Sequence, residues 1–353
     1  MVAGRVTASV VQRQVKYIRP VPVALASGLV AQVYAQGAQE TRIVTPPMLL
    51  HSPAPDVLAA YWMLVREPLV DTGTADRLSK EAVASAVSVA NICPYCLDMH
   101  SSGMYDLSTE QDAEAIVADR LAEVADPPTR TVAAWARLAH QPDAVREPPP
   151  FAEAGRAELV GVVVSSHYVN RMVNVFLANF LLPPRLGPRA RRRLKHGVSW
   201  LLGPTLRGAR EPGRSLPLLP AAPLPADAEW AAGNATVAAA VARSYAAFEA
   251  AGERTLSPAV REMVLGRLDT WRGEDTGLSR QWCERLIATL PVEDRAAGRL
   301  ALLTALASHQ VDEEVVDEFR RYRPGDAALV EAAAWASYAA ARQVGSWHAP
   351  VHH

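Results

Sequence analysis

The sequence predicts an all-α protein. Alanine and leucine are abundant among its 353 residues, whereas runs of alternating β-branched residues, which are typical of strands, are scarce. Several apolar stretches also begin at a proline, a residue that favours the first turn of a helix. Because a single core rarely holds so long a chain, we expect two domains.

The first half is predicted to hold an N-terminal extension, residues 1–43, and a helical domain, residues 44–182. A short helix is expected over residues 23–36, although Gly28 lies in its middle. The domain should then contain helices over residues 55–66, 79–90 and 94–105, a helix that starts at Ser108 in a region ended by Pro127-Pro128, and helices over residues 129–140 and 153–182.

Residues 183–227 are predicted to form a Pro/Arg-rich linker between the domains. We expect no long helix to cross them, because they hold Pro183, Pro184, Pro188, Pro204, Pro212, Pro217, Pro220, Pro223 and Pro225. The linker also carries a basic patch, at Arg185, Arg189, Arg191, Arg192, Arg193 and Lys195, followed by Trp200-Leu201-Leu202. Such a patch can bind an anionic surface as a short helix. It can also be a solvated linker over the domain seam, which we favour because its apolar part is short.

The second half, residues 228–348, is predicted to be a degenerate repeat of the first. His140-Gln141-Pro142-Asp143 has a counterpart in His309-Gln310-Val311-Asp312, and Tyr168 has one in Tyr338. Aligning Glu262 with Glu81 places Glu274, Gly277 and Gln281 where the first half has Cys93, Cys96 and His100. The second copy therefore lacks the reactive residues. Cys283 lies outside the motif and is expected to be a buried, inert thiol.

Reactive residue types gather in the stretch from Glu81 to His100. Cys93 and Cys96 are separated by two residues, Glu81 precedes the first, and His100 follows the second by four positions. A helix starting at Pro94 would place Cys96 and His100 on one face. A helix N-terminus and a neighbouring imidazole both favour thiolate over thiol. We therefore predict a dithiol redox centre in which the pKa of Cys96 is lowered.

Each of these residues also has a purely structural interpretation. The two cysteines could form half of a zinc site, but no second Cys/His pair lies at the required spacing. Glu81 could be solvated at the start of its helix, and His100 could cap its own helix. His167, Asn170 and Arg171 can line the site or join helices by hydrogen bonds, and we favour the second role.

The pattern Glu81-x11-Cys93-x2-Cys96-x3-His100 resembles that of the alkyl hydroperoxidase D family, in the carboxymuconolactone decarboxylase-like superfamily of all-helical proteins. The resemblance covers roughly residues 44–182, including the segment from His167 to Arg171. It implies the helical fold of that family, here duplicated in tandem. Tyr95, between the cysteines, stands where the peroxidase prototype has a histidine. Because tyrosine is neutral near pH 7, it cannot replace that imidazole as a base.

The resemblance also implies a mechanism and partners. Cys96 would attack a hydroperoxide and become a sulfenic acid, and Cys93 would condense with it to a disulfide. Glu81 and His100 would form a proton relay. A lipoylated or thioredoxin-like dithiol protein would reduce the disulfide, and no flavin, haem or metal cofactor is implied. Members of the family usually assemble as trimers or hexamers, so a homo-oligomer is expected.

Two alternative functions stay open at this point, a disulfide reductase without peroxidase activity and a redox-sensing module. A decarboxylase-type lyase is disfavoured because lyase members of the superfamily lack the cysteine pair. Lys plus Arg total 36 and Asp plus Glu 37, so no nucleic-acid partner is indicated. No apolar run reaches the ~20 residues of a membrane span, and no signal-peptide pattern follows Met1. With three cysteines in this length, we expect a cytoplasmic protein.

Overall fold

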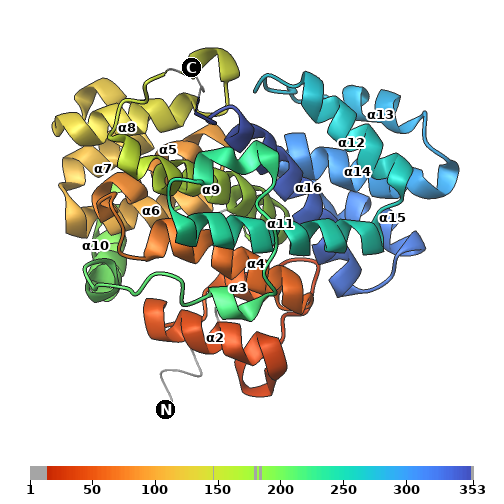
Figure 1. The fold of residues 1–353 in the computed structure, drawn as a ribbon, viewed down its shortest axis with the longest axis horizontal. Helices are drawn as coiled ribbons and strands as arrows, with labels where there is room; N and C mark the ends of the chain where they lie inside the picture. The colour runs from red at the N-terminus through yellow and green to blue at the C-terminus, as the bar shows by residue number, and fades with distance from the viewer. Residues whose placement is uncertain (1–13, 146, 179–180, 183–184, 351–353) are drawn as a thin grey trace.

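The computed structural model describes residues 14–145, 147–178, 181–182 and 185–350. In this part of the chain every regular element is a helix (Figure 1). Extended backbone pairs there in one isolated antiparallel bridge, between Val15 and Leu177. The predicted all-α fold is confirmed.

The central helix of the first half is α9, whose side chains are almost all buried. In chain order the helices of this half are α2 (Gly28–Thr41), α3 (Pro46–His51), α4 (Pro55–Val65), the π-helix η2 (Arg66–Val70), α5 (Arg77–Ala90), α6 (Pro94–Leu107), α7 (Glu110–Val117), α8 (Pro127–Leu138) and α9 (Arg156–Phe176). The segment that follows contains α10 (Pro188–Leu206). Short 3-10 turns lie at Val23–Leu25, Leu121–Glu123, Pro142–Ala144 and Glu153–Gly155.

The second half repeats this mixture of long central and short peripheral helices. It comprises α11 (Ala235–Thr255), α12 (Pro258–Thr270), α13 (Gln281–Ile287), α14 (Val292–Leu306), α15 (Glu313–Tyr322) and α16 (Asp326–Ser346). 3-10 turns lie at Leu216–Leu218, Ala226–Ala231 and Ser308–Gln310. As expected, Cys283 is fully buried on α13.

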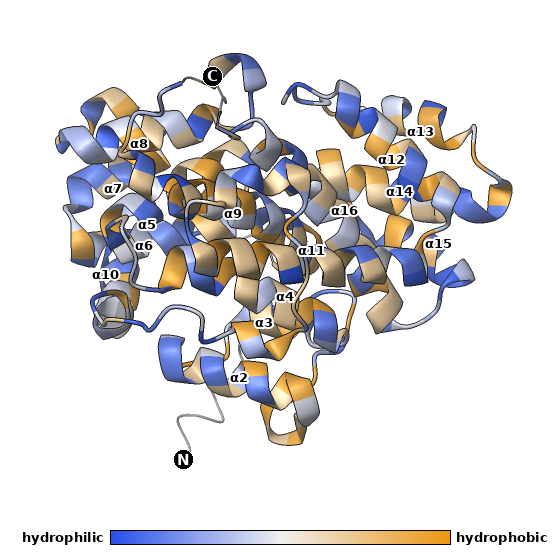
Figure 2. Ribbon diagram, viewed as in Figure 1, coloured by the Kyte–Doolittle hydropathy of each residue, from blue (hydrophilic) through white to orange (hydrophobic). Residues whose placement is uncertain are grey.

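The two halves pack together through corresponding helices. α9 lies against α16, and α4 lies against α11, in the middle of the molecule (Figure 1). Within the first half α5 packs on α8 and α9, and within the second half α12 packs on α14 and α16. Figure 2 shows apolar residues concentrated along the central helices and hydrophilic residues on the outward faces of peripheral ones. This arrangement is compatible with the predicted tandem duplication.

Two predicted helix boundaries were wrong. The first helix begins at Gly28, after a short turn at 23–25, and not at Val23. Gly28 has a φ of +53°, which glycine adopts readily, so it starts the helix and does not interrupt it. α9 ends at Phe176, six residues early, because the next residues extend and pair with the N-terminal segment at Val15.

The prediction that no long helix crosses residues 183–227 was also wrong. α10 spans Pro188–Leu206, with Pro188 in its first turn and Pro204 in its last turn. Proline is tolerated at the start of a helix, and near the end it removes one hydrogen bond. α10 packs on α6, although many of its side chains are exposed. Arg191 Nη2 binds the buried Asp98 carboxylate at 2.7 Å, and Lys195 Nζ binds Glu114 at 2.6 Å.

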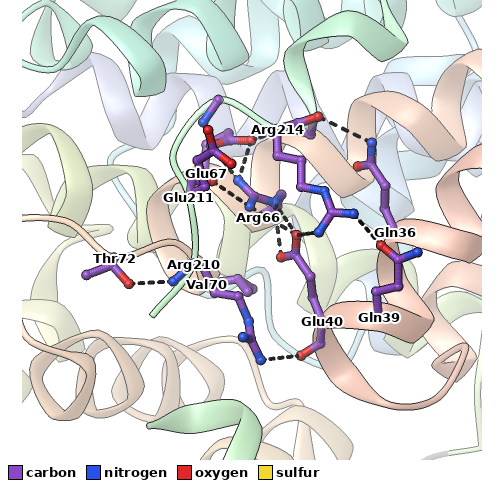
Figure 3. Close-up of polar contacts among 12 residues, drawn as sticks. Gln36, Gln39, Glu40, Arg66, Glu67, Val70, Thr72, Arg210, Glu211 and Arg214 are labelled. Atoms are coloured by element: carbon purple, nitrogen blue, oxygen red, sulfur yellow. Dashed lines mark hydrogen bonds and ion pairs between the residues drawn. The ribbon is translucent and has the colours of Figure 1, made fainter. Parts of the chain in front are cut away.

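A buried ion-pair cluster fixes the N-terminal helix and the segment after α10 to the core (Figure 3). Arg66, in the π-helix, is fully buried and binds Glu40 of α2 at 3.0 Å and its neighbour Glu67 at 2.9 Å. Nη2 of Arg66 also donates to the backbone carbonyl of Glu211 at 2.7 Å. Glu67 in turn accepts hydrogen bonds from the backbone of Gly213 and Ser215. Segments distant in sequence are thereby held around η2.

Candidate active site

The two cysteines lie at a tight turn between α5 and α6. α5 ends at Ala90, and the N–H groups of Ile92 and Cys93 close the turn by donating to the carbonyls of Val89 and Ser88 at 3.2 and 3.0 Å. This is a Schellman motif, in which the residue after the C-cap is left-handed and usually glycine. Here that residue is Ile92, with a φ of +51° and about half of its side chain exposed. A β-branched residue in this region is strained, so the turn that sets Cys93 at the start of α6 has a conformational cost.

The turn brings the two thiols into contact. Cys93 Sγ donates to Cys96 Sγ across 2.8 Å, both side chains are buried, and both are free thiols. Burial raises the pKa of Cys96 well above its ordinary value, and the adjacent Cys93 raises it further. The sequence-based expectation of a lowered pKa was therefore wrong. A backbone hydrogen bond at the start of α6 lowers the pKa of Cys96, but burial of the sulfur raises the pKa by more.

Glu81 and His100 form a hydrogen-bonded pair between α5 and α6. Glu81 Oε2 lies 2.7 Å from His100 Nδ1, and Arg77 binds Glu81 Oε1 through Nε at 2.8 Å. Burial would raise the pKa of Glu81, but Arg77 and then His100 outweigh it and hold the pKa at about 2. Glu81 is therefore an ionised acceptor at neutral pH. Nδ1 of His100 must donate to it, which leaves Nε2 with the lone pair whenever the ring is neutral.

A cavity of about 170 Å³ joins these groups. Cys96, His100, Glu81 and Arg77 all line it, whereas Cys93 does not. Its remaining wall is mainly apolar and comes from five segments of the chain, for example Ile43, Met48, Trp62, Leu69, Val169 and Leu206. One water needs 10–15 Å³ by a comparable measure, so the cavity has room for on the order of ten waters or one small organic molecule.

The other residues singled out in the sequence divide into two groups. Tyr95 and Asn170 are buried and line the cavity. Burial raises the pKa of Tyr95, so its phenol is neutral at physiological pH. His167 and Arg171 lie outside the lining and bind the cysteine turn through Asn91. His167 Nδ1 is 3.0 Å from Asn91 Nδ2, and Arg171 donates to the His167 carbonyl at 2.8 Å and to Ala305 O at 2.8 Å. Burial lowers the pKa of His167 far below its ordinary value, so the ring is neutral.

Comparison with known proteins identifies the family. The sequence model of the carboxymuconolactone decarboxylase family matches residues 56–138. A protein of Mycobacterium tuberculosis named alkyl hydroperoxide reductase is 36% identical over 333 residues, which cover 94% of each chain. The chain belongs to the carboxymuconolactone decarboxylase family. The family resemblance deduced from the cysteine motif is confirmed.

The carboxymuconolactone decarboxylase match contains the motif but only part of the cavity. Glu81, Cys93, Cys96 and His100 fall inside residues 56–138, and the wall formed by Ile43, Val169 and Leu206 falls outside. Arg77 was missed in the sequence, although its position four residues before Glu81 on one helix predicts an ion pair. The apolar wall carried no local signal, because it is assembled from segments far apart in the chain.

Two further structural findings bear on this member of the carboxymuconolactone decarboxylase family. Among the described residues no group of three His, Cys, Asp or Glu side chains is placed to hold a metal ion. None of the helices in the same part of the chain combines the length and apolar character needed to cross a membrane.

Proposed function

We propose that this chain is a thiol-dependent peroxidase that reduces organic hydroperoxides through a Cys93/Cys96 dithiol–disulfide cycle. The observation that carries the proposal is the single cavity that joins the Cys96 thiol to the Glu81–His100 pair, with Cys93 in contact behind Cys96. The name of the Mycobacterium tuberculosis relative, alkyl hydroperoxide reductase, supports the same reaction class.

The first half of the cycle begins with loss of the Cys96 proton. Because the pKa of this buried thiol is raised, a thiolate needs a local base, and Nε2 of His100 is the group available. The sulfur attacks the terminal oxygen of ROOH, so that an S–O bond forms as the O–O bond breaks. The proton on His100 passes to the departing RO⁻, which leaves as ROH, and Cys96 becomes a sulfenic acid.

The second half of the cycle restores the thiols. Cys93, 2.8 Å from Cys96, attacks the sulfenic sulfur, and water leaves as the disulfide forms. An external dithiol then exchanges with this disulfide and is itself oxidised. We propose a lipoylated or thioredoxin-like protein as the dithiol donor and a homo-oligomer as the assembly.

Turnover of cumene hydroperoxide with dihydrolipoamide or dithiothreitol tests the proposal. The wild-type protein should turn over, and Cys96→Ser should abolish activity. Cys93→Ser should be oxidised once, with a sulfenic acid trapped at Cys96, and should not turn over. A wild-type protein whose thiols resist the hydroperoxide would overturn the proposal.

A disulfide reductase or redox-sensing role is the second candidate. The contact between the Cys93 and Cys96 thiols at 2.8 Å favours it, since a dithiol pair so placed can exchange with a disulfide without any peroxide. Rapid reversible disulfide exchange with dithiols, without peroxide turnover, would identify this function.

A further inference from the structure

Asn170 lines the Cys96 cavity and carries an unused hydrogen-bond donor. Its side chain is 1% exposed, yet its Nδ2 has no partner within the described part of the chain. Its Oδ1 lies 3.4 Å from Ser88 Oγ, a weak contact because that hydroxyl already donates to the Ala84 carbonyl at 2.7 Å. Buried amides without partners are rare in native proteins, and those that persist require an explanation.

The position of Asn170 supplies that explanation. It lies on α9, on the face that also places Ser166 and Val169 along the cavity. This helix is far from the motif helices in sequence, yet it lines the same cavity as Cys96. Much of the remaining wall is apolar and offers no acceptor to the amide. A molecule bound there with an oxygen near Cys96 would meet this donor in a site of low dielectric.

We infer that Asn170 Nδ2 is the donor that binds the peroxide oxygens of an apolar organic hydroperoxide in this cavity. The apolar group R packs against the apolar wall, and the amide N–H donates to the oxygen that carries R. When the thiolate of Cys96 takes the terminal oxygen, negative charge develops on the R-bearing oxygen before His100 protonates it. A fixed donor at that atom stabilises the transition state more than the ground state. This inference rests on the proposed peroxidase function and assigns its substrate-binding donor.

Stopped-flow oxidation of the reduced protein by cumene hydroperoxide tests the inference, using Asn170→Leu. Leucine has nearly the same size and cannot donate. The second-order rate constant of oxidation should fall on the order of 10²-fold, as for loss of one donor to a developing oxyanion. Reduction of the preformed disulfide by dithiothreitol, which uses no peroxide oxygen, should be unchanged. Asn170→Met makes the same test with a more adaptable side chain, should the leucine variant fail to fold.

Thr304→Val provides a matched control. Thr304 is fully buried on α14, its hydroxyl also lacks a partner in the described residues, and it does not line the cavity. If both unpaired groups are merely structural, both substitutions should preserve or raise the melting temperature and leave oxidation unaltered. An Asn170→Leu protein oxidised at the wild-type rate, or equally slowed in disulfide reduction, would overturn the role of Asn170. Wild-type thiols inert to the hydroperoxide would overturn the peroxidase proposal itself and this inference with it.

Discussion

Arg77 should determine both the charge of Glu81 and the stability of the motif helices. Lowering the pKa of Glu81 from 4.5 to about 2 corresponds to about 3 kcal/mol in favour of the folded, ionised form. Of the two groups that lower the pKa of Glu81, Arg77 has the larger effect. It binds one oxygen of the Glu81 carboxylate at 2.7 Å, and 21% of the Arg77 side chain is exposed. Arg77→Met, which keeps the apolar stem, should therefore lower the free energy of unfolding at pH 7 by roughly 2 kcal/mol.

The sign of the pH dependence makes this prediction specific. Because the folded pKa of Glu81 is depressed, its stabilisation is complete above about pH 4.5 and is lost as the pH falls towards 2. Urea unfolding of wild type and Arg77→Met should consequently differ less at pH 3.5 than at pH 7. Arg120→Met removes an exposed ion pair with Glu123 and should cause no measurable change at either pH. An equal loss at both pH values would show that Arg77 acts through packing and not through the carboxylate.

The remaining predictions concern the turn, the buried cluster and the thiols. Ile92→Gly should raise stability by about 1 kcal/mol in thermal unfolding, since glycine relieves the left-handed strain; a loss would mean that the turn is unstrained. Arg66→Met should cost about 3–5 kcal/mol in urea unfolding, because it leaves Glu67 buried without a cation and Glu40 with only the more distant Arg214; a loss below 1 kcal/mol would contradict this. The iodoacetamide reactivity of Cys96 should still rise with pH above pH 9 in Cys93→Ser, and a plateau near neutral pH would refute burial as the cause. Cys283→Ser should leave peroxide turnover unchanged, and a large loss would make Cys283 a resolving thiol.

Local sequence rules predicted the motif helices well, because their start and stop signals lie within a few residues. Asn91 ends α5 and Pro94 begins α6, as expected from their backbone preferences. α10 was not predicted, since its stability depends on ion pairs to α6 and α7 that the local sequence cannot show. The pKa of Cys96 was predicted in the wrong direction for a similar reason. The helix start and His100 are visible in the sequence, whereas burial depends on residues from the whole domain.

The burial of Cys96 and the proposed base His100 together bear on which oxidants can react with the thiol. A thiol exposed to solvent with a low pKa would react with any oxidant that reaches it. Here the pKa is raised, and in the proposed cycle reaction requires a molecule that fits the cavity and lies where His100 can accept the thiol proton. Reactivity is then coupled to binding. In the proposed cycle, selectivity for apolar hydroperoxides follows from that coupling, because the apolar wall and Asn170 hold the substrate while the proton moves.

The second half of the chain supports this cavity only indirectly, because the lining residues all lie between Thr41 and Leu206. α16 packs against α9, and Arg171 of α9 donates to the carbonyl of Ala305 next to the end of α14. These contacts hold α9, the helix that carries both Asn170 at the cavity and His167 at the cysteine turn. In the proposed cycle, the half without the cysteine motif acts as support for the half that carries it.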